Sequence, residues 1–199
     1  GGRAPGGRWV SGGGWRVGAG RGVRAAWIAV AFLGALALGA LWGWRRAGPP
    51  DLATWGDAID AAAEESGLDG ALLRALVAVE SGGRADAVSG KGARGLLQVM
   101  PATARAEAER LGLGALDEEA LYEPAVNLRI GASYLARLLR RYDDDLPFAL
   151  AAYNAGPTAV NRWRRRLPHL ASLQVVLREG YPETRVHVTR VLRWRAAYR

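Results

Sequence analysis

Residues 51–199 repeat apolar side chains at spacings of three and four, and this pattern constrains the fold more than any other feature. No alternation of apolar and polar residues, as a half-buried strand requires, is sustained in this part of the chain. Glycines and prolines divide the pattern into segments of helical length. The sequence therefore predicts an all-α domain over residues 53–199, which is large enough to bury one core.

The ends of the expected helices carry specific signals. Asp69 is suited to cap a helix that runs to about Glu80, and proline opens several of the other helices. The glycine-rich stretch from Ser81 to Gly95 predicts a long loop or a hairpin-like lobe. Helices are expected over residues 53–65, 69–80, 101–111, 124–142, 147–153, 157 to beyond 163, 170–177 and 182–198.

The first 50 residues differ in composition from the rest. Residues 1–24 are rich in Gly and Arg and contain no acidic residue, which predicts a basic, disordered tail. Residues 25–44 contain no charge and as a helix would span roughly 30 Å, the thickness of a bilayer core. Tryptophans lie near both ends of this run. We predict a transmembrane anchor there and a linker over residues 45–52; a cleaved signal peptide, giving a secreted form, is the alternative.

The distribution of charge indicates how such an anchor would be oriented. Five arginines precede the uncharged run and two follow it, so the positive-inside rule places the tail in the cytoplasm. The domain would then lie on the periplasmic side of the inner membrane. The net charge of +8 comes from the two terminal segments, because residues 51–159 carry 10 basic and 17 acidic side chains.

The basic C-terminal segment, residues 160–199, has several interpretations. It carries 10 basic and 2 acidic residues. No nucleic-acid recognition motif accompanies this charge, so nucleic-acid binding is not expected. The alternatives are a solvated helix face or attraction to anionic lipid or cell wall. The chain has no Cys and only two His, His169 and His187, so neither a zinc site nor another cofactor is expected.

Glu80 is the first candidate catalytic residue. It closes the apolar run of residues 71–79 and precedes Ser81. Burial where a hydrophobic helix meets a loop can keep a carboxyl group protonated, and a protonated carboxyl group in a cleft is a general acid. The position of Glu80 alone is equally typical of a solvated Glu at a helix end.

Three sequence blocks resolve that ambiguity. They are Glu80-Ser81-Gly82 with Ser89, then residues 92–101 (GARGLLQVMP), then residues 151–157 (AAYNAGP). In this order and spacing they resemble the catalytic domain of soluble lytic transglycosylases, the SLT domain of the lysozyme-like superfamily, from about Trp55 to Trp194. The resemblance implies an enzyme that cleaves the MurNAc-β-1,4-GlcNAc bond of peptidoglycan glycan strands and leaves 1,6-anhydromuramoyl ends, with Glu80 as the single general acid and base.

The resemblance also implies the remaining site residues. Those expected to contact substrate are Ser89, Gln98, Met100, Tyr153, Asn154 and Glu183, with Ser81 and Gly95 in support. In the family, the Tyr that matches Tyr153 reaches toward the catalytic carboxyl group. These positions also have plainer interpretations. They are turn or helix-end hydrogen bonds for the serines, an exposed place before a helix for Gln98, core filling for Met100, a hydroxyl bonded to a neighbouring loop for Tyr153, a turn into residues 156–157 for Asn154, and a favourable helix dipole for Glu183.

The chain departs from the family pattern at three places. Gly83, Arg84 and Ala85 stand where an aromatic residue, Asn and Pro are common, which would loosen the lobe or remove a contact. His187 replaces a usual Tyr, affecting one substrate or packing contact, and Leu97 replaces a common Met.

Two other functions fit the same fold. A goose-type lysozyme would need a second carboxylate, for which Asp86 is the candidate. A non-catalytic peptidoglycan-binding scaffold is the other alternative, and the sequence identifies no partner in the cell envelope.

Overall fold

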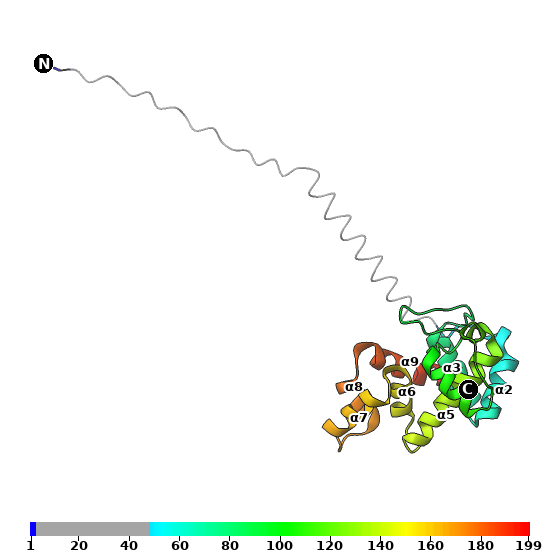
Figure 1. Cartoon of the computed structure of the whole chain (residues 1–199). Helices are drawn as coiled ribbons and strands as arrows, with labels where there is room; N and C mark the ends of the chain where they lie inside the picture. Colours follow the sequence, from blue (N-terminus) through cyan, green and yellow to red (C-terminus); the bar gives the residue numbers. More distant parts are fainter. Residues whose placement is uncertain (3–47) are drawn as a thin grey trace. The chain divides into compact units, whose positions relative to one another are not determined.

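The computed structural model describes residues 1–2 and 48–199. The predicted membrane span, residues 25–44, lies outside the described residues, as do nearly all of the predicted tail and the first part of the linker. Within the described part, no helix combines the length and apolarity needed to cross a membrane. Residues 48–199 form one compact unit (Figure 1).

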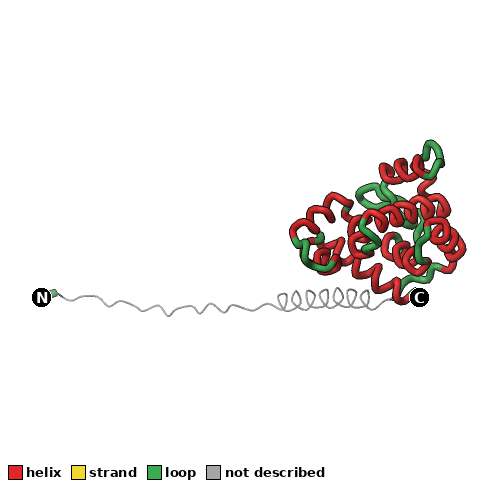
Figure 2. Tube along the Cα trace, turned by 90° about the horizontal axis from the view of Figure 1, so that it is seen from below, coloured by secondary structure: helices red, strands yellow, loops and turns green. Residues whose placement is uncertain are grey.

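The described domain is built from helices joined by loops, as Figure 2 shows. This confirms the all-α prediction for the described residues. In chain order the elements are η1 (Ala53–Trp55), α2 (Gly56–Ser66), α3 (Gly70–Glu80), α4 (Pro101–Arg110), η2 (Glu118–Tyr122), α5 (Pro124–Arg141), α6 (Leu146–Ala155), α7 (Pro157–Arg166), α8 (Ser172–Glu179) and α9 (Pro182–Ala197).

Most helices begin and end where the sequence indicates. The side chain of Asp69 accepts a hydrogen bond from the Ala71 N–H at 3.0 Å and caps α3. Asp145 caps α6 in the same way through the Phe148 N–H. Gly67, at φ +70°, ends α2 in the left-handed conformation that glycine adopts at least cost. The short 3₁₀ turn η2 was not predicted, because five residues are too few to show a helical period.

The core lies around α3 and α6. Seven of the eleven residues of α3 are buried, and so are five of the ten of α6. Helix α9 packs against both, and α5 packs against α2 and α6. In Figure 1, α2 lies at one side of the domain, α7 and α8 lie at the other, and α3, α5, α6 and α9 lie between them. A fully buried leucine such as Leu76 contributes about 2 kcal/mol, so α3 is held mainly by its apolar contacts.

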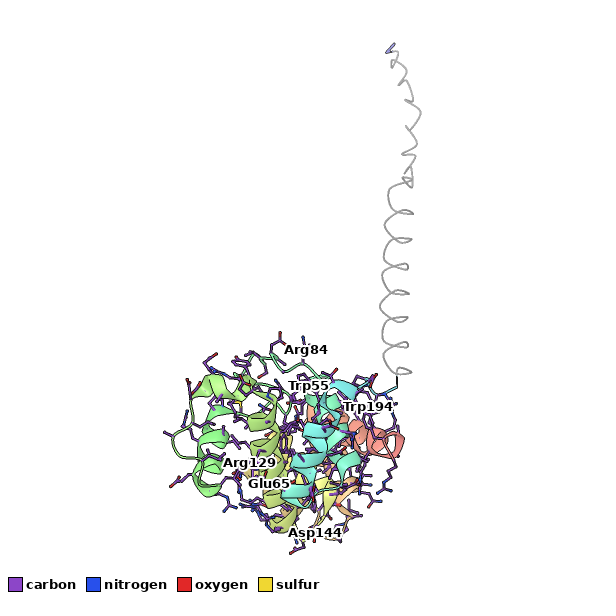
Figure 3. All side chains as sticks on the ribbon, turned by 90° about the vertical axis from the view of Figure 1, so that its right-hand side faces the viewer. Trp55, Glu65, Arg84, Arg129, Asp144 and Trp194 are labelled. Carbon is purple, nitrogen blue, oxygen red and sulfur yellow. The ribbon has the colours of Figure 1, made fainter. Side chains whose placement is uncertain are left out.

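One buried carboxylate, Glu107, joins α4 to α5. Its Oε1 accepts a hydrogen bond from Arg137 Nε at 2.6 Å, and its Oε2 accepts one from Ser133 Oγ at 3.0 Å. Since the Glu107 side chain is fully buried, these partners offset the cost of removing its charge from water. Glu65 and Arg129, which Figure 3 shows side by side, form an exposed pair at 2.7 Å of the kind worth only about 0–1 kcal/mol.

Residues 81–100, between α3 and α4, form the hairpin-like lobe that the sequence predicts. Isolated antiparallel bridges join Val88 to Arg94 and Arg94 to Val99. The lobe is held from inside by Asn127 of α5, whose side chain is fully buried. Its Nδ2 donates to the carbonyls of Arg94 (2.8 Å) and Leu121 (2.9 Å), and its Oδ1 accepts from the Leu97 N–H (2.8 Å).

Gly95 is required where the lobe passes Asn127. Its φ is +75°, and a Cβ there would overlap Asn127 Nδ2 and the Leu121 carbonyl oxygen. No other residue combines that conformation with so little volume. The supporting role expected of Gly95 is therefore a backbone role.

The start of the lobe, where Gly83 stands in place of a common aromatic residue, lies against Leu52 and Trp55. Trp55 Nε1 donates a hydrogen bond to the Gly83 carbonyl at 2.8 Å. A Cβ on Gly83 would come 2.8 Å from Leu52 Cδ2, so Leu52 and Trp55 occupy the adjacent space. Figure 3 shows Trp55 at the same end of the domain as Arg84. Side chains from the segment before α2 therefore contact the start of the lobe.

Candidate active site

Glu80 is the last residue of α3, and its side chain is 13% exposed. The apolar side chains before it are buried in the core, so the helix holds this carboxyl group at the edge of the interior. The following residue, Ser81, donates its hydroxyl to the Val77 carbonyl (3.3 Å) and accepts from the Gly83 N–H (3.1 Å). Ser81 therefore stabilises the turn that leaves the helix, which is its plainer interpretation.

Two cavities share part of their lining, and Glu80 lines one of them. The Glu80 cavity, of about 220 Å³, is lined by Glu80, Ser89, Lys91, Ala93, Gln98, Met100, Tyr153 and Asn154. The Tyr134 cavity, of about 330 Å³, is lined by Lys91, Gln98, Val99, Met100, Thr103, Tyr134, Tyr153, Asn154, Ala155 and Gly156. The structure thus brings Glu80 together with five of the six residues expected to contact substrate. They come from three segments: the end of α3, the lobe and α6.

Ser89 and Gln98 reach the Glu80 cavity from the lobe and also stabilise the lobe. Ser89 Oγ accepts hydrogen bonds from the Ala93 N–H (3.0 Å) and the Lys91 N–H (3.3 Å). Gln98 Nε2 donates to the carbonyls of Ala87 (3.1 Å) and Gly95 (3.0 Å). Gln98 has φ +46°, a conformation that costs a non-glycine residue about 1–3 kcal/mol. Such a strained position is common at functional sites.

Tyr153 and Asn154 reach the cavities from α6. The Tyr153 hydroxyl donates to the Leu97 carbonyl at 2.8 Å, and its ring contacts that of Tyr134 with centroids 5.2 Å apart. Its hydrogen bond therefore goes to the neighbouring lobe, as in its plainer interpretation. Burial, and then the charge of Glu80, raises the pKa of the Tyr153 phenol well above its usual value. Asn154 Oδ1 accepts from the hydroxyl of buried Thr184 on α9 at 2.7 Å.

Met100 and Glu183 have different surroundings. Met100 is 41% exposed and lines both cavities, so it is not core filler. Glu183 is exposed in the first turn of α9, where a negative charge favours the helix dipole. It is not among the described residues that line either cavity.

Sequence reasoning missed several residues of this site, including Tyr134 and Thr103 in the Tyr134 cavity, and two polar residues nearer Glu80. His187 Nε2 lies 2.8 Å from Glu80 Oε1, whereas the sequence marks His187 only as a departure from the family pattern. Lys91, the only lysine of the chain, lines both cavities. The available signal for His187 was its place in a late motif that contributes to the cleft in the family. The sequence gives no comparable signal for Lys91, because a position in a loop does not indicate a role.

Tyr153→Phe tests the bond between α6 and the lobe. The change should lower the free energy of unfolding by about 1–2 kcal/mol at neutral pH, because the Leu97 carbonyl loses its donor. The folded-state pKa of Tyr153 is raised above the usual value of 10.0, so the unfolded chain deprotonates first. The contribution of the phenol is therefore complete below pH 10 and is lost as the pH rises through the folded-state pKa.

Denaturant unfolding of the wild type and of Tyr153→Phe between pH 8 and pH 11 measures this effect. The difference in unfolding free energy between the two proteins should shrink above about pH 10. Tyr181→Phe, at an exposed tyrosine of the same domain, is the matched control. Equal stabilities of wild type and Tyr153→Phe at neutral pH would contradict a structural role for the hydroxyl.

Comparisons with known proteins identify relatives of this chain. The family model described as Transglycosylase SLT domain matches residues 57–174. The soluble lytic murein transglycosylase of Escherichia coli K12 is 34% identical over 113 residues, which cover 54% of this chain and 17% of the relative. A transglycosylase of Enterobacteria phage PRD1 is 38% identical over 107 residues, covering 54% of this chain and 37% of the relative.

Solved structures show the same likeness. An inactive glutamate-to-glutamine mutant of lytic transglycosylase Slt from Pseudomonas aeruginosa has a TM-score of 0.66 and 32% identity, over 71% of this chain and 23% of that one. The 70-kDa soluble lytic transglycosylase of Escherichia coli has a TM-score of 0.67 and 29% identity, over 73% and 24%. The chain spans less than a quarter of the length of each of these two relatives. Because the family model covers more than half of the sequence, the chain belongs to the transglycosylase SLT domain family.

Proposed function

We propose that this protein is a lytic transglycosylase that cleaves the β-1,4 bond between N-acetylmuramic acid and N-acetylglucosamine in peptidoglycan. The observation that carries the proposal is the setting of Glu80. Among the described residues that line the two cavities, it is the one carboxylate. The names of the relatives, lytic murein transglycosylases, support the same substrate.

Glu80 would act first as an acid and then as a base. Its protonated carboxyl group gives a proton to the glycosidic oxygen as the bond from that oxygen to the muramoyl C1 breaks. The resulting carboxylate then takes the proton of the muramoyl C6 hydroxyl, whose oxygen attacks C1. The products are a 1,6-anhydro sugar and a free 4-hydroxyl, and no water is consumed. One carboxyl group suffices because the nucleophile belongs to the reacting sugar, which gives it a high effective concentration.

The other cavity residues suit a glycan strand. Ser89, Gln98 and Asn154 offer polar groups for sugar hydroxyls and acetamido groups, and Met100 offers an apolar surface. Glu183, exposed at the start of α9, would contact only parts of the strand that extend beyond the two cavities.

The alternative of a goose-type lysozyme has less support. It needs a second carboxylate that activates water across the sugar from Glu80. Asp86, its candidate, is exposed on the lobe and is not among the described residues that line the cavities. The combination of Glu80, Gln98 and Tyr153 around one cavity also favours catalysis over a scaffold that only binds.

We further propose that residues 25–44 anchor the chain in the inner membrane with the SLT domain on the periplasmic side. The length of the uncharged run and the excess of arginine before it support this orientation. Some relatives are named membrane-bound lytic murein transglycosylases, including one from Cellvibrio japonicus that is 39% identical over 108 residues.

The proposal is tested by digesting purified peptidoglycan with the full chain in detergent and weighing the new ends by mass spectrometry. Muramoyl ends lighter than reducing ends by one water are expected. Reducing ends would instead indicate a hydrolase with a second carboxylate. Binding to peptidoglycan without cleavage would support the scaffold.

A further inference from the structure

The catalytic candidate Glu80 has a hydrogen-bond partner that the proposed mechanism does not yet use. His187 Nε2 lies 2.8 Å from Glu80 Oε1, although the two residues are 107 positions apart. The contact joins two of the most closely packed helices of the domain, α3 and α9. The His187 side chain is 6% exposed, so water does little to weaken the interaction.

The surroundings of the imidazole indicate which nitrogen carries its proton. His187 Nδ1 is buried and has no hydrogen-bond partner among the described residues. If Glu80 donated to Nε2, or if the imidazole were doubly protonated, Nδ1 would carry a buried N–H for which no described residue supplies an acceptor. Such unpaired donors are rare in proteins, and leaving one costs about 1–3 kcal/mol. An imidazole with its proton on Nε2 avoids that buried N–H and leaves Nδ1 with an unpaired lone pair instead, an omission that proteins tolerate more often.

From this geometry we propose that His187 is a positioning residue that donates its Nε2–H to Glu80 Oε1 and so reserves Oε2 for the reacting proton. The inference rests on the proposed function. Oε1 accepts this hydrogen bond whether Glu80 is protonated or ionised, because a carboxylic acid protonated on Oε2 keeps Oε1 as an acceptor. The proton given to the glycosidic oxygen and the one taken from the C6 hydroxyl both pass through Oε2.

Fixing Oε1 matters because Oε2 must approach the glycosidic oxygen first and the C6 hydroxyl afterwards. A carboxyl group free to rotate at the end of α3 would spend time in unproductive orientations. Displacements of about 1 Å can cost about 10²-fold in rate. Tyr is the usual residue at position 187 in the family that the sequence resembles. Its phenol also donates a hydrogen bond, so either Tyr or His can supply the donor there.

Variants of the full chain test the role through kcat and KM for peptidoglycan. His187→Phe keeps a ring and removes the donor, so kcat should fall about 10–100-fold with KM nearly unchanged. His187→Gln restores an N–H donor and should recover kcat to within about fivefold of the wild type. His169→Phe, at the other, exposed histidine of the chain, is the control and should leave both constants unchanged. Wild-type kcat in a folded His187→Phe would overturn the proposal.

A spectroscopic measurement needs neither a variant nor activity. In ¹⁵N-histidine-labelled protein at neutral pH, His187 should show a protonated Nε2 and an unprotonated Nδ1. Protonation of Nδ1 would overturn the inference. A wild type that produced no anhydro ends would refute the proposed function, whereas production of those ends with full activity in His187→Phe would refute only the role of His187.

Discussion

Glu80→Gln is expected to reduce peptidoglycan cleavage about 10³-fold or more and to leave folding nearly unchanged. Glutamine has almost the same shape and can still accept a hydrogen bond from His187 at its amide oxygen. It cannot give up or take the proton that the mechanism requires, and general acid–base catalysis contributes about 10²–10⁴-fold. No second carboxylate among the described cavity-lining residues can take over. Release of soluble muropeptides from purified peptidoglycan measures the loss.

Asp86→Asn is the matched control for Glu80→Gln. It makes the same chemical change six positions along the chain, at an exposed residue outside the described lining of the cavities. Cleavage at the wild-type rate is expected for Asp86→Asn, and thermal unfolding should verify that both variants are folded. Near-normal activity of Glu80→Gln would refute the assignment of Glu80, and loss of activity in both variants would favour a two-carboxylate hydrolase.

Local signals made the helices of this domain predictable. Asp69, Pro101, Pro124 and Pro157 each mark a helix start, and the structure begins a helix at or next to each of them. The lobe was predictable as a loop because glycines interrupt the helical period over residues 81–95. The cavity residues around Glu80 were predicted from the order of three motifs, because periodicity alone does not distinguish Ser89 or Gln98 from other loop residues.

Contacts between distant segments were not predictable in this way. Asn127 stands in the apolar stripe of α5, so the period predicts that it is buried, but not that it bonds the backbone 30 and 33 residues earlier. His187 lies 107 residues from Glu80, and only the packing of α9 on α3 brings the two together. Residues of this kind depend on how the helices dock, which no local pattern encodes.

Asn127→Leu is expected to lower the free energy of unfolding by about 3–5 kcal/mol. Leucine has a similar shape but leaves two backbone groups without partners, the Leu97 N–H and the Leu121 carbonyl, and removes one of the two hydrogen bonds that the Arg94 carbonyl accepts. Each unsatisfied group costs about 1–3 kcal/mol. Urea denaturation of the variant and the wild type at neutral pH measures the difference. Asn161→Leu is the control: its Oδ1 accepts one bond, from the Tyr142 hydroxyl, so a loss near 1 kcal/mol is expected.

Asn127→Leu should also impair cleavage without touching substrate. The Leu97 N–H is held by Asn127 and the Leu97 carbonyl by Tyr153, so one residue of the lobe is fixed from both α5 and α6. Gln98, the next residue, keeps a strained backbone conformation only while its neighbours hold it. Hydrogen exchange at the Leu97 amide should therefore accelerate in the variant, together with a fall in turnover. A folded variant with slow exchange at Leu97 and normal turnover would show that the lobe is positioned by its own turns and by Trp55, not by α5.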